Sequence, residues 1–382
     1  MVLRIAVATR IYEPEAGAAA YRLAAMVSEL EKRGNKVTVY TSRAPNATRS
    51  TMGVRRWPVL RDRAGAVRGY LQYASFDIPL FFRLLFGKAF DVAIVEPPPT
   101  TGLIVMLAAA IRRRPFIYFA ADVSSVAAAG IGVAKPVVSV LRAMERTVLS
   151  AARFVLTVSS GVSQAVVDLT HRPEKVVNVG TGVDTKKFSL DGERTEEGGR
   201  YFVYAGTMSE IQGAGIFVDA FLRIASEFPD VRLLMYGDGV EKEELRVRAA
   251  STERVEFPGT VGSEILSRIL RGAVAGLASV RPSKGYDFAF ATKALVSLSC
   301  GTPVIYAGVG PLRDVVSSER LGRSVDWDIE QVANAMRASL SAQTSDSERR
   351  RLAGWVQRNH SLARVGANAA AVVARIGHNT GS

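Results

Sequence analysis

The chain contains one cysteine and three histidines in 382 residues, so thiol and imidazole groups are scarce. Its only thiol, Cys300, has no partner for a disulfide bond within the chain, which fits a reducing compartment. Because Cys300 lies in an apolar helical run, we expect it in the core. One thiol and three imidazoles also exclude the ligand spacing of a zinc site, so the sequence implies no metal.

Long apolar runs are absent as well. The best of them, GLIVMLAAAI at 102–111, is about half of the roughly 20 residues needed to cross a bilayer, and it predicts a packed helix. The first residues, MVLRIAVATR, predict a strand and lack the basic and apolar regions of a signal peptide. Nothing in them directs secretion, so we expect a cytoplasmic protein.

Acidic residues are fewer than basic ones, 36 against 49, which gives a formal net charge of +13. Such a surface attracts anions, which could be nucleic acid, an acidic membrane face or a phosphorylated small molecule. An RNA-binding pattern of aromatic and basic residues interleaved on strands is missing, so nucleic acid is not an expected partner.

Basic residues gather just before an aromatic, apolar stretch, FDIPLFFRLLFGKAF at 76–90. They are Arg55, Arg56, Arg61, Arg63 and Arg68, and the stretch itself contains Arg83 and Lys88. This pairing suits peripheral contact with an anionic membrane surface. A core helix with a solvated basic flank fits the same pattern, because amphipathic periodicity alone does not separate the two.

Short β-rich runs alternate with helical runs along the chain, which is typical of α/β folds with parallel sheets. A first helix at 18–33 places Leu23, Met26, Val27 and Leu30 on one face. The predicted strands are 3–10, 36–42, 54–60, 91–97, 115–122, 153–160 and 175–182 in the first half, and 201–207, 231–238, 255–261, 273–280 and 302–308 in the second.

The polar, glycine-rich segment 189–200 interrupts this alternation and is the best candidate for a linker. We therefore predict two Rossmann-like domains, 1–185 and 186–358. In such sheets ligands bind beyond the carboxyl ends of the strands, so the loops there are the candidate binding sites.

In the first domain, Gly17 and Ala18 stand at a helix start that could receive a phosphate, although a tight turn needs small residues anyway. In the second domain the loops that follow strands converge on one edge of the sheet. Their candidate residues for a phosphate- or nucleotide-sized pocket are Thr207, Gly237, Phe257, Gly259 and Gly310. Each glycine could also be a simple turn.

Six segments in order resemble the GT-B glycosyltransferases of family 4. They are RIAVATRIYEPEAGAAAYRLAAMVSELEKRGNKVTVYTS, VGTGVDTKKF, YAGT with QGAG, LMYGDG, VEFPGTV and TKALVSLSCGTPVI. The resemblance implies two Rossmann-like domains facing each other across a cleft, with a final helix at 359–376 packing back on the first domain. It also implies sugar transfer from a nucleoside-diphosphate sugar with retention of configuration. That sugar nucleotide is a co-substrate, and no cofactor is implied.

By this resemblance Lys293 lies close to the donor diphosphate, where a fixed ammonium would stabilise the leaving group. A lysine that snorkels from a core helix to solvent is the alternative. Arg281 and Lys284 are supporting cations, and Gln212 replaces a lysine common in the family. Val296 stands where the family usually has the glutamate that binds the ribose hydroxyls, and valine cannot accept a hydrogen bond.

Two carboxylates, Asp122 and Glu96, follow predicted strands of the first domain. Asp122 could orient the acceptor hydroxyl or take its proton, or it could simply cap the next helix. Glu96 is a second carboxylate for which the same two interpretations, a functional and a structural one, apply. The histidine that relatives carry beside the acceptor-side aspartate is missing.

These residues favour a retaining glycosyltransferase, with donor on the second domain and acceptor on the first, in cell-envelope polysaccharide or glycolipid synthesis. Its acceptor would be lipid-linked or a saccharide, with the protein peripheral on the inner face of the membrane. The alternative is a GT-B-like nucleotide-binding protein that has lost transfer, for which Val296 is the chief argument.

Overall fold

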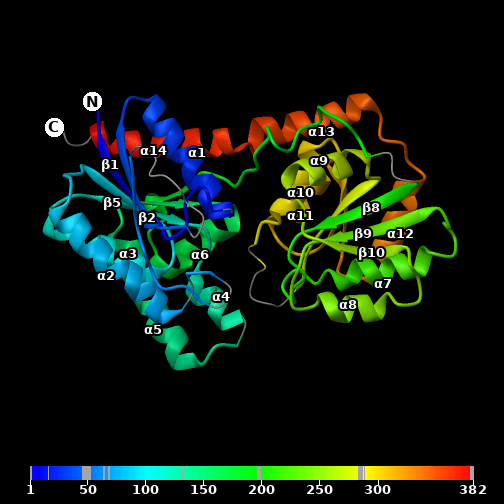
Figure 1. The fold of residues 1–382 in the computed structure, drawn as a ribbon, viewed down its shortest axis with the longest axis horizontal. Helices are drawn as coiled ribbons and strands as arrows, with labels where there is room; N and C mark the ends of the chain where they lie inside the picture. The colour runs from blue at the N-terminus through cyan, green and yellow to red at the C-terminus, as the bar shows by residue number, and fades with distance from the viewer. Residues whose placement is uncertain are drawn as a thin grey trace. The chain divides into compact units, whose positions relative to one another are not determined.

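The computed structural model describes residues 2–15, 17–44, 53–62, 65–67, 69–130, 132–195, 199–282, 287 and 289–378. The chain forms two compact units, traced in Figure 1. Unit 1 consists of Met1–Thr181 and Leu362–Ser382, and unit 2 consists of Gly182–Ser361. Each unit is built on its own parallel sheet, which is the α/β class that the sequence predicts.

Within the described residues, the sheet of unit 1 has the strand order β3-β2-β1-β4-β5-β6-β7. Its central strands β4 and β5 are buried along their whole length, as expected for a parallel sheet covered on both faces. The strands are β1 (Arg4–Ala8), β2 (Lys36–Ser42), β3 (Val54–Trp57), β4 (Val92–Val95), β5 (Phe116–Ala120), β6 (Phe154–Thr157) and β7 (Val176–Asn178).

Helices cover both faces of this sheet (Figure 1). The first and the last helix pack together over one face, and α2, α3 and α5 cover the other. The helices of unit 1 are α1 (Ala18–Lys32), α2 (Tyr70–Phe86), α3 (Pro99–Ile111), α4 (Ser124–Gly130), α5 (Lys135–Ala151), α6 (Ser160–Thr170) and α14 (Leu362–His378), with a 3-10 turn at Pro173–Lys175.

Helix α14 joins unit 1 although it is far from the rest of that unit in sequence. Its apolar side, with Val365 and Val373, packs into the same buried cluster as Leu23 and Met26 of α1. The two helices approach closely at Gly366, where an added Cβ would lie 2.6 Å from the carbonyl oxygen of Ala25. A side chain at this position would therefore push the helices apart.

The sheet of unit 2 has the strand order β10-β9-β8-β11-β12-β13 among the described residues. Its last strand, β13, was not predicted, because GRSV is short and polar and forms an edge strand. The strands are β8 (Arg200–Ala205), β9 (Val231–Tyr236), β10 (Val255–Gly259), β11 (Ala275–Val280), β12 (Val304–Gly308) and β13 (Gly322–Val325).

On one face of this sheet α7 packs against α12, and on the other α10 packs against α13. Cys300, at the end of α10, is fully buried, which confirms its predicted place in the core. In unit 1, residues 102–111 lie within α3, which confirms the predicted packed helix. The helices of unit 2 are α7 (Gly215–Ile224), α8 (Lys242–Arg248), α9 (Ser263–Gly272), α10 (Thr292–Ser299), α11 (Pro311–Ser318), α12 (Ile329–Leu340) and α13 (Asp346–Asn359).

Both sheets share one topology. In each sheet the first three strands are added one after another toward one edge. The fourth strand then pairs with the free side of the first strand, so that β1 neighbours β4 and β8 neighbours β11. Ligands in such sheets bind beyond the carboxyl ends of the strands at this reversal. A binding site in either unit is therefore expected at this edge of its sheet.

The segment predicted as the linker is not a free connection. Residues 182–195 belong to unit 2, so the division falls at 181/182 rather than at 185/186. The buried guanidinium of Arg271 on α9 donates to the carbonyl oxygens of Ser189, Asp191 and Glu193 at 2.8–3.0 Å. Polar composition suggested a linker, but one buried arginine satisfies this backbone and fixes it to the unit.

Replacing Arg271 with methionine should lower the free energy of unfolding of unit 2 by about 3 kcal/mol, because buried carbonyl oxygens lose charged donors. Urea unfolding and limited proteolysis would measure it, with new cleavage expected within 189–195. Arg268→Met is the matched control, since the side chain of Arg268 on the same helix forms an exposed ion pair with Glu193 and its loss should cost less than about 1 kcal/mol. Equal losses in the two variants would contradict the role given to Arg271.

The stretch 76–90 fits neither of its two interpretations alone. Most of it forms α2, which buries Phe76 and Leu80 but leaves Phe82 and Phe86 exposed. Of the basic residues before it, Arg61 is paired with Glu15 at 2.8 Å and Arg56 donates to the carbonyl oxygen of Glu13, so these cations bind within the unit. Arg63 and Arg68 lie outside the described residues. No helix among the described residues is long and apolar enough to span a bilayer.

Candidate functional site

Lys293 lies in the first turn of α10, and its side chain reaches across to the end of β8. Its ammonium donates to the hydroxyl of Tyr204 at 2.7 Å and to Oε1 of Gln212 at 2.6 Å, and it lies 4.3 Å from the centre of the Tyr204 ring. It does not snorkel to solvent. The amino end of a helix repels cations, so this position is unfavourable for a lysine in the absence of an anion.

The ammonium of Lys293 is buried without a negatively charged partner among the described residues. Burial lowers the pKa of Lys293 to about 7, and no carboxylate among the described residues raises it again. Its two hydrogen-bond partners, Tyr204 and Gln212, are neutral, because burial also raises the pKa of the Tyr204 phenol. A buried cation with neutral partners gains most from an anionic ligand such as a phosphate.

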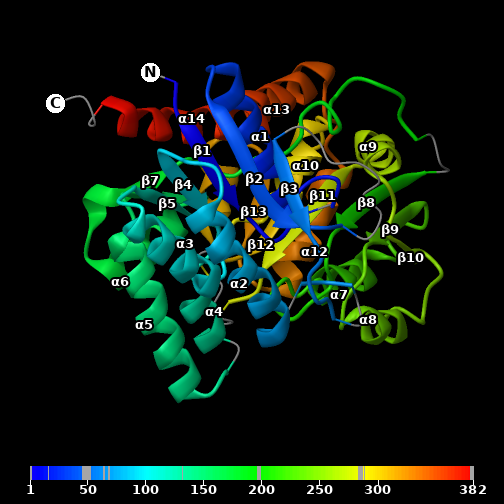
Figure 2. The same cartoon turned by 60° about the vertical axis from the view of Figure 1, so that its left-hand side comes forward.

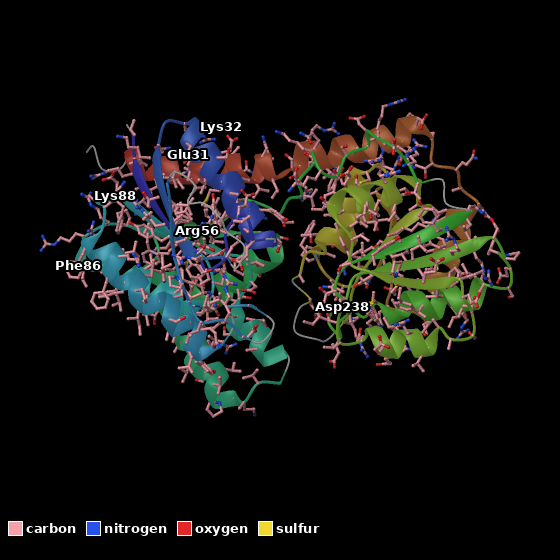
Figure 3. All side chains as sticks on the ribbon, viewed as in Figure 1. Glu31, Lys32, Arg56, Phe86, Lys88 and Asp238 are labelled. Carbon is pink, nitrogen blue, oxygen red and sulfur yellow. The ribbon has the colours of Figure 1, made fainter. Side chains whose placement is uncertain are left out.

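Glycines bring the neighbouring strand ends close to this ammonium. An added Cβ at Gly206 would lie 3.3 Å from Nζ of Lys293, and one at Gly237 would lie 2.0 Å from the carbonyl oxygen of Gly206. The Gly237 amide donates to the carbonyl oxygen of Gly259 at 2.8 Å. Figure 3 labels Asp238, which directly follows Gly237. The absence of a side chain at Gly237 therefore lets the loops after β8 and β9 meet.

The other residues predicted for this pocket are spread more widely. Thr207 is exposed, and its carbonyl oxygen accepts from Tyr204 at 2.7 Å. Phe257 lies in β10, partly buried against the core. Gly310 precedes α11, and an added Cβ there would lie 2.8 Å from the carbonyl oxygen of Ala289, just before α10. Lys284 lies outside the described residues.

Arg281 occupies a different place from Lys293. It follows β11 and lines a pocket of about 750 Å³ with Gly213, Glu241 and Trp327. This pocket carries several carboxylates besides its arginines, and Arg281 lowers the pKa of Glu241 against the larger, opposite effect of burial. Arg281 therefore lines a pocket with acidic side chains, while its amide donates to the carbonyl oxygen of Ile211, next to the Lys293 partner Gln212.

Val296 lies one turn after Lys293, on the side of α10 that packs against the core. It is partly buried among apolar residues of two clusters, which include Leu295, Leu298 and Leu270. A valine supplies neither donor nor acceptor. The departure from the family pattern is therefore accommodated by apolar packing.

In unit 1, Glu96 follows β4 at the reversal of the sheet and is only 6% exposed. Thr9, after β1, donates to it at 2.5 Å, and the guanidinium of Arg22 on α1 lies 3.6 Å from its second oxygen. Burial raises the pKa of Glu96, and Arg22 opposes this shift. Glu96 is thus enclosed by unit 1 itself, which suits a residue that positions Arg22 better than one that contacts substrate.

Asp122 follows β5, the neighbour of β4. Its Oδ1 atom is buried and has no hydrogen-bond partner among the residues that the structure describes. Burial raises the pKa of its carboxyl, while Arg22 and the Ser124 hydroxyl act in the opposite direction. Capping of the next helix is the task of Glu145, which accepts from the amides of Ser124 at 2.8 Å and Ser125 at 3.0 Å. The first amides of α4 are therefore capped by Glu145, so helix capping does not explain Asp122.

Arg22 was missed by the sequence analysis, although it connects these carboxylates. It is 7% exposed, and both Glu96 and Asp122 raise its pKa against the effect of burial. A signal was present: residues four apart share a helix face, and Arg22, Met26 and Leu30 follow that spacing. The sequence analysis also missed the hydroxyl of Tyr118, which is buried with no hydrogen-bond partner in the described part of the chain.

Gly17 and Ala18 lie where they were predicted, at the start of α1. Gly17 precedes the helix, no side chain caps it, and an added Cβ at Gly17 would meet no atom within 4 Å. Because glycine has no side chain, Gly17 itself does not cap the first amides of α1. No three His, Cys, Asp or Glu side chains in the described part of the chain gather as metal ligands do.

Solved structures share this fold, with two Rossmann-like units in one chain. Sucrose-phosphate synthase from Thermosynechococcus elongatus matches with a TM-score of 0.76 and 16% identity, over 99% of this chain and 100% of that one. The Anabaena protein HepE in complex with UDP-glucose matches with a TM-score of 0.71 and 13% identity, over 98% and 100% of the two chains. The fold is GT-B.

Family models match both units. Residues 17–182 match the model described as "Glycosyl transferase 4-like domain", and residues 199–342 match "Glycosyl transferases group 1". The chain therefore belongs to the GT-B glycosyltransferases of family 4, as its motifs indicate.

Curated relatives match over shorter stretches. A GDP-mannose-dependent alpha-(1-6)-phosphatidylinositol dimannoside mannosyltransferase of Mycobacterium tuberculosis is 30% identical over 142 residues, which is 36% of this chain and 35% of the relative. A phosphatidyl-myo-inositol mannosyltransferase of Mycolicibacterium smegmatis is 29% identical over 188 residues, 48% of this chain and 46% of the relative. The chain thus spans less than half the length of these relatives.

Proposed function

We propose that this protein is a retaining glycosyltransferase that moves a sugar from a nucleoside-diphosphate sugar to an acceptor hydroxyl. The observation that carries the proposal is Lys293: a desolvated ammonium with neutral partners at the carboxyl edge of the unit 2 sheet. A diphosphate supplies the charge that this site lacks. At Gly206 and Gly237 the absence of side chains lets the backbone of the strand ends lie close to this ammonium.

The acceptor would bind at the corresponding edge of unit 1. There Asp122 offers a free carboxylate oxygen, held near Arg22 and Glu96. The names of the curated relatives refer to phosphatidylinositol acceptors, which supports a lipid-linked acceptor in glycolipid or envelope polysaccharide synthesis. A free saccharide is the other acceptor class that these groups could bind.

In the proposed reaction the bond from the anomeric carbon to the diphosphate oxygen breaks, and the nucleoside diphosphate leaves with the electron pair. The acceptor oxygen bonds to the same face of the carbon, and its proton passes to the leaving phosphate. Lys293 stabilises the negative charge that develops on that phosphate. Asp122 orients the acceptor hydroxyl. No protein nucleophile is needed, which agrees with the absence of a catalytic pair of side chains from the sequence motifs.

The test is a thermal-shift screen against UDP-, GDP-, ADP- and dTDP-sugars, followed by measurement of donor hydrolysis. A ligand that binds only the folded state at 100 times its Kd adds about 2.7 kcal/mol to stability, so the matching donor should raise the Tm by a few degrees. Slow hydrolysis of that donor alone should accompany it. No shift with any sugar nucleotide at millimolar concentration would overturn the proposal.

A second function, nucleotide binding without transfer, is favoured by Val296. The usual ribose-binding glutamate is absent, and apolar packing fills its position. Tight binding of a nucleotide sugar without turnover, with or without extracted lipids as acceptors, would establish this alternative.

A further inference from the structure

Helix α2 is apolar on both of its faces. Phe76, Leu80 and Leu84 are buried against the sheet. On the opposite side, Ile78, Phe82 and Phe86 are 57%, 54% and 77% exposed, four residues apart in turn. A helix that meets only water carries charged and polar residues on its outer face. The outer face of α2 instead presents a continuous apolar row.

The neighbouring helix extends this row. Helices α2 and α3 pack side by side on the same side of the sheet (Figure 2). Arg112, just after α3, donates to the carbonyl oxygen of Leu85 at 2.7 Å, so the carboxyl ends of both helices lie together. Leu107 and Ile111 of α3 are exposed, and the rings of Phe82 and Phe86 stack at 6.3 Å. We call Ile78, Phe82, Phe86, Leu107 and Ile111 the α2–α3 face.

Within the stretch 70–114 that forms the α2–α3 face, the exposed charged side chains are mainly positive. Between Tyr70 and Arg114 the sequence has three acidic residues. Asp77 and Glu96 are buried, and Asp91 is paired with Arg4 at 2.7 Å. The exposed cations of this stretch are Arg83, Lys88, Arg113 and Arg114. Figure 3 shows Phe86 and Lys88 at the outer margin of unit 1.

We propose that the α2–α3 face docks on a lipid bilayer that contains anionic headgroups. The apolar row would enter the boundary between headgroups and acyl chains, and the cations around it would bind lipid phosphates. Charge decides between this occupant and a second copy of the chain. Two copies meeting at this face would bring cations of the same sign together, whereas anionic lipid complements them. The inference is independent of sugar transfer, because docking needs no donor.

The test is flotation of the whole protein with vesicles of phosphatidylcholine alone or with phosphatidylglycerol, in the absence of nucleotide sugar. We expect binding to the anionic vesicles, weaker at high salt. Phe82→Ser with Phe86→Ser should lower it at least tenfold, because each ring loses apolar burial. Lys88→Glu with Arg113→Glu should remove the preference for anionic vesicles.

Matched controls keep the result interpretable. Val240→Ser with Val247→Ser removes two comparably exposed apolar side chains from unit 2 and should leave vesicle binding unchanged. The variants alter exposed residues, so their Tm should stay close to that of the wild type. Equal binding by wild type and the Phe82/Phe86 variant would overturn the proposal. So would sedimentation showing a dimer that this variant abolishes, without vesicle binding by the wild type.

Discussion

Replacing Lys293 with methionine should remove the donor-induced thermal shift and lower kcat/KM by about 10²–10³-fold, the usual loss for one preorganised group that stabilises a leaving anion. Methionine keeps the length of the side chain but cannot carry the charge. The measurements are the Tm with and without the donor identified in the screen, and the initial rate of donor turnover.

Lys242→Met is the matched control for this variant. Lys242 also stands in the first turn of a helix in unit 2, but it already has a partner, the carboxylate of Asp238 at 3.6 Å. Its replacement should leave the donor-induced shift within experimental error. Retention of the full shift by the Lys293 variant would assign Lys293 a purely structural role.

The same lysine should give the protein a pH signature. Burial lowers the pKa of Lys293 to about 7, against roughly 10.4 for an unfolded lysine. Between these two values the unfolded state binds more protons, so the contribution of this group to stability rises with pH across that window. Diphosphate binding needs the charged form. Donor affinity, measured by titration calorimetry, should therefore fall above pH 7, by up to about tenfold per pH unit, and should lose this dependence in Lys293→Met.

Replacing Asp122 with asparagine should lower kcat by about 10²-fold with only a small loss in Tm, because the side chain keeps its shape but a neutral amide replaces the charged group that orients the acceptor hydroxyl. The loss of stability should be small because Oδ1 has no hydrogen-bond partner among the described residues, so the change removes mainly the attraction between the carboxylate and Arg22. Donor binding should also be preserved, because it depends on unit 2. Turnover in the presence of acceptor and the donor-induced thermal shift together separate these effects.

Glu145→Gln provides the opposite pattern as a control. Glu145 holds the first amides of α4 and is buried, so its loss of charge should lower the Tm without a specific effect on chemistry. If Asp122→Asn lowered the Tm as Glu145→Gln does, and retained turnover, Asp122 would be a structural residue rather than part of the acceptor site.

The sequence predicted most of the fold because its signals are local. Every strand expected in 3–308 has a counterpart, and the helix expected at 359–376 is α14, Leu362–His378. The strand β13 was missed because four residues with two exposed positions carry no β-type pattern. Residues 189–195 were interpreted as part of a linker because composition does not reveal that Arg271 binds their carbonyl oxygens.

The candidate site was predictable only in part. Motif order pointed to Lys293, but its neutral partners Tyr204 and Gln212 come from the other side of the strand reversal, 89 and 81 residues away in sequence. Likewise, two carboxylates were found by their place after strands, whereas the arginine between them stands on a helix that precedes both. Pairing across such distances depends on the sheet order.

The sequence by itself determined that this chain folds as two α/β units of the family 4 type, because periodicity, glycine positions and motif order are properties of neighbouring residues. Tertiary structure decided which charged groups are paired and which are left without a counter-charge. It left Lys293 with neutral partners, gave the capping of α4 to Glu145 instead of Asp122, and turned half of an apolar helix outward. The physical reason is that desolvation and Coulomb energy depend on what surrounds a group in space, which chain order does not specify.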